Sequence, residues 1–146
     1  KYCKEIYYTQ NGKSYFSIAF KNDLDGYELR NKYFKGCIGK KAITFIKNNN
    51  DSVCIFEGFI DFLSYKTMYK SYTLNEDYII CNSTALVKSI LPKIKDYHSV
   101  YACLDNDNSG RDATQFLRLN HRGVFDAGIA YMQYNDLNDY LVKTVT

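Results

Sequence analysis

Two aspartates separated by one residue, Asp105 and Asp107, are the side chains in this sequence best suited to bind a metal ion. They follow the apolar run Val100–Leu104, whose length and content predict a buried strand, and they precede a stretch of turn formers and an amphipathic helix. Side chains two residues apart on an extended chain point the same way, so both carboxylates can face one cation. In open α/β sheets, ligands bind at this junction of strand and helix.

The sequence around this pair allows more than one interpretation. Aspartates in turns commonly cap helices or close turns. A calcium loop of the EF-hand type is excluded, because its twelfth position is Phe116 where a Glu is needed and because a strand precedes it. A magnesium site for phosphoryl chemistry stays open, since Mg²⁺ keeps several waters and takes only a few carboxylates together with phosphate oxygens.

A second acidic pair follows another predicted strand. Glu57 comes directly after the run Ser52–Phe56, and Asp61 falls in the first turn of a helix predicted over Phe59–Tyr69. The helix dipole favours an acid in the first turn, which accounts for Asp61 better than for Glu57. The carboxyl ends of parallel strands share one edge of a sheet, so Glu57 can face Asp105 and Asp107 if the two strands are neighbours.

Basic and aromatic residues alternate in a segment upstream of both acidic pairs. The segment Gly26–Lys41 contains five basic residues and a single acid, Glu28. A solvated loop would explain this charge, but interleaved aromatic side chains also suit phosphate contacts combined with base stacking. The candidate nucleotide- or DNA-binding residues here are Arg30, Lys32 and Lys35, with Tyr33 and Phe34 as stacking residues.

Length and composition favour one compact α/β unit with a short N-terminal extension. The chain has 146 residues, 46% of them hydrophobic, a single proline and a net charge of +3. Its five cysteines form no CxxC pair, which favours reduced thiols over a zinc site. We expect a cytoplasmic protein with no membrane partner, since neither a membrane span nor a signal peptide is present. A start at Lys1 further suggests a piece of a larger protein.

Two patterns of predicted elements divide the chain. Short strands joined by turns predict a small antiparallel meander, and Asn11-Gly12 is a strong hairpin signal. Buried strands then alternate with helices, which predicts a parallel sheet of about four strands flanked by helices. We therefore predict an N-terminal antiparallel β and basic segment over residues 1–46 and an α/β domain over residues 47–146. The meander strands are Glu5–Thr9, Ser14–Lys21 and Gly26–Arg30; the later strands are Ser52–Phe56, Tyr78–Cys81, Val100–Leu104 and, more weakly, Val124–Tyr131; a further helix is predicted over Ala85–Ile94.

The two acidic motifs, in this order, resemble those of a TOPRIM domain, the catalytic module of topoisomerases, bacterial-type primases and some nucleases. Glu57–Asp61 is similar to its EGxxD motif and Asp105–Arg111 to its DxDxxGR motif. Asn82–Ala85 resembles the GTA turn of the primase branch, and Asp136–Leu141 resembles a late acidic motif. The resemblance covers nearly the whole chain and is closest to primase-like proteins of plasmids and mobilisable elements. It implies a TOPRIM-type, Rossmann-like fold.

Two residues depart from the primase pattern. Asn106 stands between the paired aspartates where primases often have Gly, and Asn138 stands where a second late aspartate is common. The second departure leaves Asp136 as the better candidate for a third metal-facing carboxylate.

The resemblance also implies an activity and its residues. It implies an enzyme, a DNA primase-type nucleotidyltransferase that makes RNA primers on single-stranded DNA from nucleoside triphosphates during replication or mobilisation of DNA. Mg²⁺, or Mn²⁺, would be held by Asp105 and Asp107 with help from Asp61 or Asp136, and Glu57 would be the catalytic acid/base or a further ligand. Arg30, Lys32, Lys35 and Arg111 would contact nucleotide or DNA, and a helicase or relaxase would be a partner. A TOPRIM nuclease and a non-catalytic DNA-binding module of a mobilisation complex are the alternatives.

Overall fold

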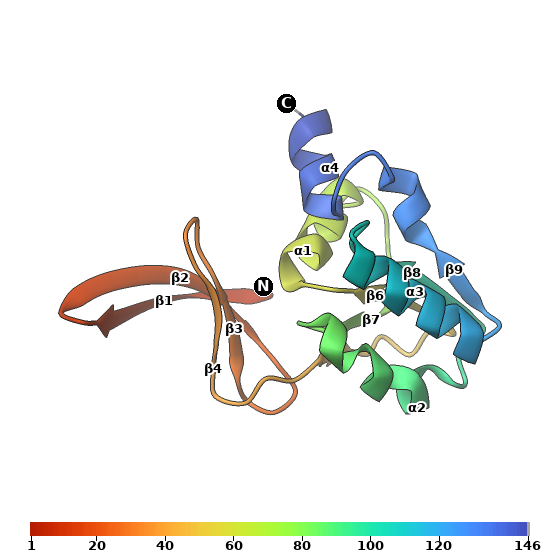
Figure 1. Ribbon diagram of the computed structural model, residues 1–146, viewed down its shortest axis with the longest axis horizontal. Helices are drawn as coiled ribbons and strands as arrows, with labels where there is room; N and C mark the ends of the chain where they lie inside the picture. The colour runs from red at the N-terminus through yellow and green to blue at the C-terminus, as the bar shows by residue number, and fades with distance from the viewer. Residues whose placement is uncertain (146) are drawn as a thin grey trace.

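The N-terminal quarter of the chain forms a strongly twisted antiparallel sheet. The computed structural model describes residues 1–145, and its first sheet has four strands in the order β1-β2-β3-β4 (Figure 1). These strands are β1 (Cys3–Gln10), β2 (Lys13–Lys21), β3 (Tyr27–Arg30) and β4 (Lys35–Ile38). Asn11 and Gly12 both have positive φ, 51° and 72°, as the predicted hairpin turn requires. Strand β4 was not predicted, because its sequence KGCI carries little β propensity.

The second sheet is mostly parallel and has five strands in the order β5-β7-β6-β8-β9. The strands are β5 (Thr44–Ile46), β6 (Ser52–Phe56), β7 (Asp77–Ile80), β8 (Ser99–Cys103) and β9 (Val124–Asp126). Strands β7, β6, β8 and β9 are parallel to one another, and β5 pairs antiparallel with β7 at one edge. The predicted α/β class, a parallel sheet of about four strands with helices and a preceding meander, is confirmed.

Helices cover both faces of the parallel sheet and divide the core into two parts. The helical segments are α1 (Phe59–Met68), the 3₁₀-helix η1 (Thr84–Ile90), α2 (Leu91–Ile94), α3 (Asn108–Asn120), the 3₁₀-helix η2 (Ala127–Tyr131) and α4 (Leu137–Thr144). One part of the core packs η1, α2 and α3 against the sheet, and the other packs α1 and the start of α4 against its opposite face (Figure 1). No helix among residues 1–145 is long and apolar enough to cross a membrane.

Three local predictions differ from the structure. The helix predicted over Ala85–Ile94 is a 3₁₀-helix followed by one turn of α-helix, and Pro92 lies in the first turn of α2, where its missing N–H costs nothing. The strand predicted over Val124–Tyr131 ends at Asp126, whose carboxylate accepts the Gly128 N–H (3.0 Å) and caps η2. Strand β5, on the N-terminal side of the boundary predicted at residue 46, pairs in the second sheet.

The two sheets are joined by an aromatic stack and by hydrogen bonds at the start of β5. The rings of Phe20 in β2 and Phe59 in α1 are stacked with centroids 5.2 Å apart and an interplanar angle of 3°. The Asp23 carboxylate accepts the Phe45 N–H (3.0 Å), and the Thr44 hydroxyl donates to the Lys21 carbonyl (2.9 Å). These contacts hold strands β3 and β4 beside the carboxyl ends of the parallel strands.

Candidate active site

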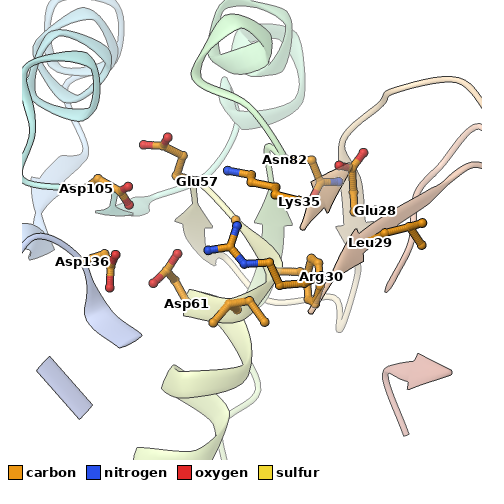
Figure 2. A pocket seen from close by; sticks show the side chains of 12 residues that line it. Glu28, Leu29, Arg30, Lys35, Glu57, Asp61, Asn82, Asp105 and Asp136 are labelled. Carbon is orange, nitrogen blue, oxygen red and sulfur yellow. The ribbon is translucent and has the colours of Figure 1, made fainter. Parts of the chain in front are cut away.

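A cleft lies between the antiparallel sheet and the carboxyl ends of β6 and β8 (Figure 2). Its volume is about 520 Å³, including the part open to solvent. On one side is the acidic wall, formed by Glu57, Asp61, Asp105 and Asp136. On the other is the basic wall, formed by Arg30 of β3 and Lys35 of β4, whose side chains point toward the carboxylates. The charged and polar residues that line the cleft are Glu28, Arg30, Lys35, Glu57, Asp61, Asn82, Asp105 and Asp136.

The topology of the parallel sheet brings the acidic motifs together. Strands β6 and β8 are neighbours, with Phe56 paired to Cys103, so Glu57 and Asp105 leave the sheet at the same edge. Asp61 lies in the first turn of α1, and Asp136 directly precedes α4. The Asp61 carboxylate accepts the Asn138 N–H (3.1 Å), which joins the starts of these two helices.

Burial and mutual repulsion raise the pKa values of three carboxyl groups in this wall, those of Glu57, Asp61 and Asp105. Burial and then the charge of Glu57 raise the pKa of Asp105 to about 8. Burial and then Asp136 raise the pKa of Asp61 to about 6. The pKa of Glu57 is also raised, by burial and then by Asp107, although Lys35 opposes the shift. Ionisation of the whole wall would therefore place negative charge there that the protein itself does not compensate.

Three buried oxygen atoms at the cleft have no hydrogen-bond partner. They are Glu28 Oε1, Glu57 Oε2 and Asn82 Oδ1, and within residues 1–145 no other buried side-chain nitrogen or oxygen lacks a partner. All three residues line the cleft. Buried polar groups are nearly always hydrogen-bonded, and unpaired acceptors at one place point to a ligand that brings cations or donors.

An all-oxygen set of this kind fits Mg²⁺ or Mn²⁺. Among the described residues, no three His, Cys, Asp or Glu side chains form a ready-made metal-binding group. Mg²⁺ does not need one, because it usually takes one or two carboxylates plus waters and substrate phosphates. The residues that fit best are Glu57 and Asp105. Glu57 carries a buried oxygen without a hydrogen-bond partner, and Asp105 has the most strongly raised pKa among the carboxyl groups.

Two of the predicted metal-facing aspartates are helix caps in the structure. Asp107 Oδ1 accepts the Gly110 N–H (2.8 Å) at the start of α3, and Asp136 Oδ1 accepts the Asp139 N–H (2.7 Å) at the start of α4. Asp136 lines the cleft, whereas Asp107 does not. Asp107 is nevertheless close enough to raise the pKa of Glu57. The capping interpretation of Asp107 therefore describes its observed contact, and a metal-binding role for it stays a prediction.

Asn106 ties the loop of Asp105 to the segment that carries Asp136. Its Nδ2 donates to the carbonyl oxygens of Gly128 (3.3 Å), Tyr131 (3.1 Å) and Tyr134 (3.0 Å). Its backbone N–H donates to the Asn135 carbonyl (2.6 Å). A glycine at this position would lack the side-chain donor, so the departure from the primase pattern supplies a structural link in this chain.

The four predicted basic residues are placed differently. Arg30 and Lys35 are paired across β3 and β4 and point into the cleft toward the acidic wall (Figure 2). Lys32 lies outside the cleft lining, with its ammonium 5.4 Å from the centre of the Tyr33 ring. Arg111 is exposed on α3 and does not line the cleft.

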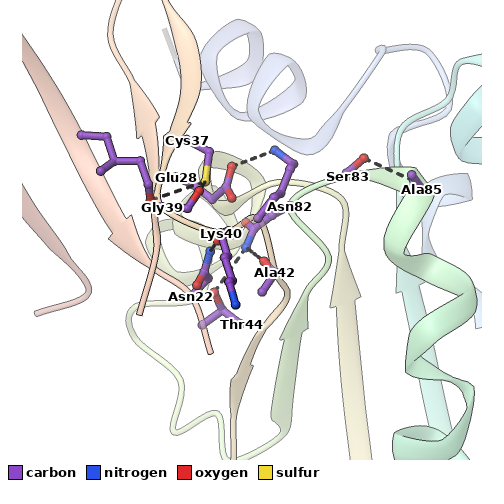
Figure 3. A network of polar contacts seen from close by, with 12 residues as sticks. Asn22, Glu28, Cys37, Gly39, Lys40, Ala42, Thr44, Asn82, Ser83 and Ala85 are labelled. Atoms are coloured by element: carbon purple, nitrogen blue, oxygen red, sulfur yellow. Dashed lines mark hydrogen bonds and ion pairs between the residues drawn. The ribbon is translucent and has the colours of Figure 1, made fainter. Parts of the chain in front are cut away.

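Two cleft residues were missed by the sequence analysis as site residues. Asn82 has φ of 61° and donates from Nδ2 to the Ala42 carbonyl (2.8 Å), as part of the network in Figure 3. The left-handed conformation favours Gly or Asn, which suits an asparagine to this turn. Glu28 is buried and pairs with Lys41 (2.9 Å). The feature of the sequence that could have identified Glu28 as a site residue is its position as the single acid in the basic segment Gly26–Lys41.

Comparison with known families agrees with this arrangement. Residues 54–141 match the family model described as Toprim-like. The chain belongs to this Toprim-like family. The matched region contains the acidic wall and ends within α4, so the TOPRIM resemblance inferred from the motifs is confirmed. Residues 1–39 match a second family, described as "Domain of unknown function (DUF8464)". No curated protein matches the chain.

The Toprim-like chain also shares its fold with a solved primase structure. It superposes on the crystal structure of the primase fragment of the bacteriophage T7 primase-helicase protein with a TM-score of 0.68 and 14% sequence identity. The match covers 95% of this chain and 62% of the phage fragment. The alignment therefore includes both sheets, and the TOPRIM fold of primase type is confirmed. Closeness to plasmid proteins stays a prediction.

Proposed function

We propose that this Toprim-like chain is the core of a primase-type nucleotidyltransferase that joins nucleoside triphosphates on a single-stranded DNA template. The observation that carries the proposal is the division of one cleft into an acidic wall, which includes the unpartnered Glu57 Oε2, and a basic wall of Arg30 and Lys35. A nucleoside triphosphate with its divalent cation has the complementary charges. The primase fold of the chain agrees with this assignment.

In the proposed reaction, Asp105 would hold Mg²⁺ or Mn²⁺ with help from Asp61 or Asp136, and Glu57 would be either a further ligand or the catalytic base. When bound, the cation neutralises the charge that develops on the transferred phosphoryl group and on the leaving pyrophosphate. Arg30 and Lys35 bind the triphosphate from the opposite wall, because two cations on adjacent strands can contact phosphate oxygens together.

The proton of the attacking 3′-hydroxyl needs an acceptor within the cleft. Glu57 is the candidate, since one of its carboxylate oxygens is buried without a partner and its raised pKa makes it a stronger base than an exposed Glu. Lys32 and Arg111 lie outside the cleft lining, and we propose that they contact more distant parts of the nucleic acid. A metal-binding role for Asp107, which also lies outside the lining, stays a prediction. A helicase or relaxase partner and a cytoplasmic location stay predictions from the sequence.

Calorimetry tests the site without requiring turnover. Mg²⁺ is titrated into the wild type, Asp105→Asn and Glu57→Gln, with and without a nucleoside triphosphate. We expect wild-type binding that tightens with the triphosphate and a loss of at least tenfold in both variants. Asp96→Asn is the matched control, because Asp96 is an exposed aspartate that does not line the cleft. Negligible Mg²⁺ binding by the wild type, with or without triphosphate, would overturn the proposal.

A nucleotide-incorporation assay separates the proposal from its alternatives. Labelled triphosphates and a single-stranded template should give Mg²⁺- or Mn²⁺-dependent products that Asp105→Asn abolishes. Metal-dependent cleavage of the template without incorporation would instead identify a TOPRIM nuclease. Metal-independent DNA binding with neither reaction would identify a non-catalytic DNA-binding module.

A further inference from the structure

The β1–β2 hairpin extends away from the rest of the molecule (Figure 1) and carries exposed aromatic rings. Tyr7 is 75% exposed and Phe16 is 41% exposed, although large aromatic side chains are usually buried. Tyr33, in the loop between β3 and β4, is 88% exposed. We call Tyr7, Phe16 and Tyr33 the aromatic strip.

The aromatic strip continues the basic wall of the cleft. Tyr7 and Phe16 are cross-strand partners whose ring centroids are 5.4 Å apart, so they lie on one face of the sheet. Ile18 lies on the same face two residues along β2, and its cross-strand partner is Arg30. The pair is therefore about 7 Å along the strand from the level of Arg30 and Lys35, at a strand rise of about 3.4 Å per residue.

The backbone of Tyr33 is tied to β2 through the side chain of Asn31. Asn31 Nδ2 donates to the Phe16 carbonyl (2.8 Å) and to the Ser17 hydroxyl (3.1 Å), while Asn31 Oδ1 accepts the Tyr33 N–H (2.8 Å). A backbone hydrogen bond from the Asn31 N–H to the Phe34 carbonyl (3.0 Å) closes the loop. The exposure of Tyr33 thus occurs in a loop that is anchored to β2.

The charges around the strip favour a polyanion as its occupant. Arg30, Lys32 and Lys35 lie on or next to the strip, and Glu5 is the one exposed acid on the same face of β1 and β2. Exposed aromatic rings beside cations are the combination by which proteins bind single strands, since bases stack on the rings and phosphates contact the cations. Duplex DNA offers no free base faces, so this surface discriminates against it.

We propose that the aromatic strip is a stacking platform for the bases of a single-stranded nucleic acid, and that it guides the strand along the hairpin to the cleft. The direction toward the cleft rests on the proposed function. Binding at the strip does not, because none of its rings belongs to the cleft lining.

Fluorescence anisotropy with labelled single-stranded DNA, without metal or triphosphate, tests the strip. Loss of one stacked base should weaken binding about five- to 100-fold in Phe16→Ala and Tyr7→Ala. Tyr15→Ala is the matched control, because Tyr15 is 39% exposed, adjoins Phe16 in β2 and faces the other side of the hairpin. We expect Tyr15→Ala to bind within twofold of the wild type and Phe16→Trp to retain binding.

Salt dependence provides a second readout that a folding defect would not produce. Phe16→Ala should keep the wild-type slope of log affinity against log salt, because no phosphate contact is lost. Lys32→Ala should reduce that slope by about 0.7 for one lost contact to a single strand. Equal affinity of Phe16→Ala and wild type, or an equal loss in Tyr15→Ala, would overturn the proposal.

The test also separates this proposal from the proposed function. Phe16→Ala should leave Mg²⁺–triphosphate binding unchanged, and the exposed control Asp96→Asn should leave metal-free DNA binding unchanged. Failure of calorimetric metal binding alone would remove the nucleotidyl-transfer assignment and leave the platform in place. If light scattering shows a dimer that Phe16→Ala dissociates and DNA binding is absent, the strip is an interface between copies of the chain, and the platform proposal is wrong.

Discussion

The two sheets that form the cleft differ in how their side chains are buried. In the parallel sheet, Val53, Ile55, Ile79 and Val100 are completely inaccessible to solvent, because helices cover both faces. In the antiparallel sheet, burial is concentrated near Phe20 and Leu29, while the hairpin tip is exposed on both faces. The acidic wall therefore lies at the edge of the buried parallel sheet. The basic wall and the aromatic strip lie on the more exposed antiparallel sheet.

This difference suggests a division of tasks within the cleft. Carboxylates that repel one another must be held in place by surrounding packing, and a sheet buried on both faces provides that. A surface that receives a long, flexible strand needs accessible rings and cations instead. The stability of each region should accordingly respond very differently to the loss of an aromatic side chain.

The largest expected effect is a loss of stability when the aromatic core between the sheets is disrupted. Phe62 is fully buried and contacts the rings of Tyr2, Phe20, Phe56 and Tyr78. Phe62→Ala should lower the free energy of unfolding by about 3–5 kcal/mol. Urea denaturation should show a change of at most about 0.5 kcal/mol for Phe16→Ala on the hairpin. Similar losses in the two variants would contradict the contrast between the sheets.

The next effect concerns the close approach of α3 to the Asp105 loop. A Cβ atom on Gly110 would lie 2.1 Å from the Asp105 carbonyl oxygen, so the backbone must move to accept it. Gly110→Ala should cost about 1–3 kcal/mol of stability and also weaken Mg²⁺–triphosphate binding, because Asp105 is displaced. The measurements are urea unfolding and calorimetry. Gln115→Ala, at an exposed position of the same helix, should change neither quantity appreciably.

A smaller effect is expected when the hydrogen bonds that hold the segment before Asp136 are removed. Asn106→Ala removes the donor shared by three carbonyl oxygens, which should cost about 1–2 kcal/mol. Hydrogen exchange should rise in residues 128–135 and stay unchanged in β6 and β7. Asn120→Ala is the control, since it removes only an exposed bond to the Phe116 carbonyl (2.8 Å) within α3. Unchanged exchange in residues 128–135 would show that Asn106 does not hold this segment.

The smallest effect is a pH dependence of the acidic wall in metal-free protein. The pKa of Asp105 is raised from 3.8 to about 8, so between these values the folded state binds more protons than the unfolded state. Stability contributed by this site therefore falls as pH rises from about 4 to about 8. Asp105→Asn should raise the melting temperature by about 2–4 °C at pH 8, since Asp105 is only half-buried and solvent screens its charge. Thermal melts near pH 4 should show no difference, and stabilisation that is greater at pH 4 than at pH 8 would contradict the assignment.

Much of the architecture could be predicted because its signals are local. The runs Ser52–Phe56 and Val100–Leu104 are apolar enough to require burial on both faces, and β6 and β8 occupy these places within one residue. The 3₁₀ geometry of η1 and the early end of β9 at Asp126 could not be predicted in the same way. Apolar spacing does not distinguish a 3₁₀-helix from a short α-helix, and a capping Asp at position 126 overrides the following apolar residues.

The sequence by itself determined the alternation of buried strands and helices after residue 51, the position of Glu57 and Asp105 at the ends of two of these strands, and the resemblance to the TOPRIM fold. Each of these follows from neighbouring residues, since strand burial and helix capping act over a few positions. Only the tertiary structure decided that Arg30 and Lys35 face the carboxylates and that Lys32 and Arg111 do not line the cleft. The same holds for the donor role of Asn106 and the unpartnered oxygens of Glu28 and Asn82. These features depend on how two separately formed sheets pack together, and contacts between distant segments leave no periodic pattern in the sequence.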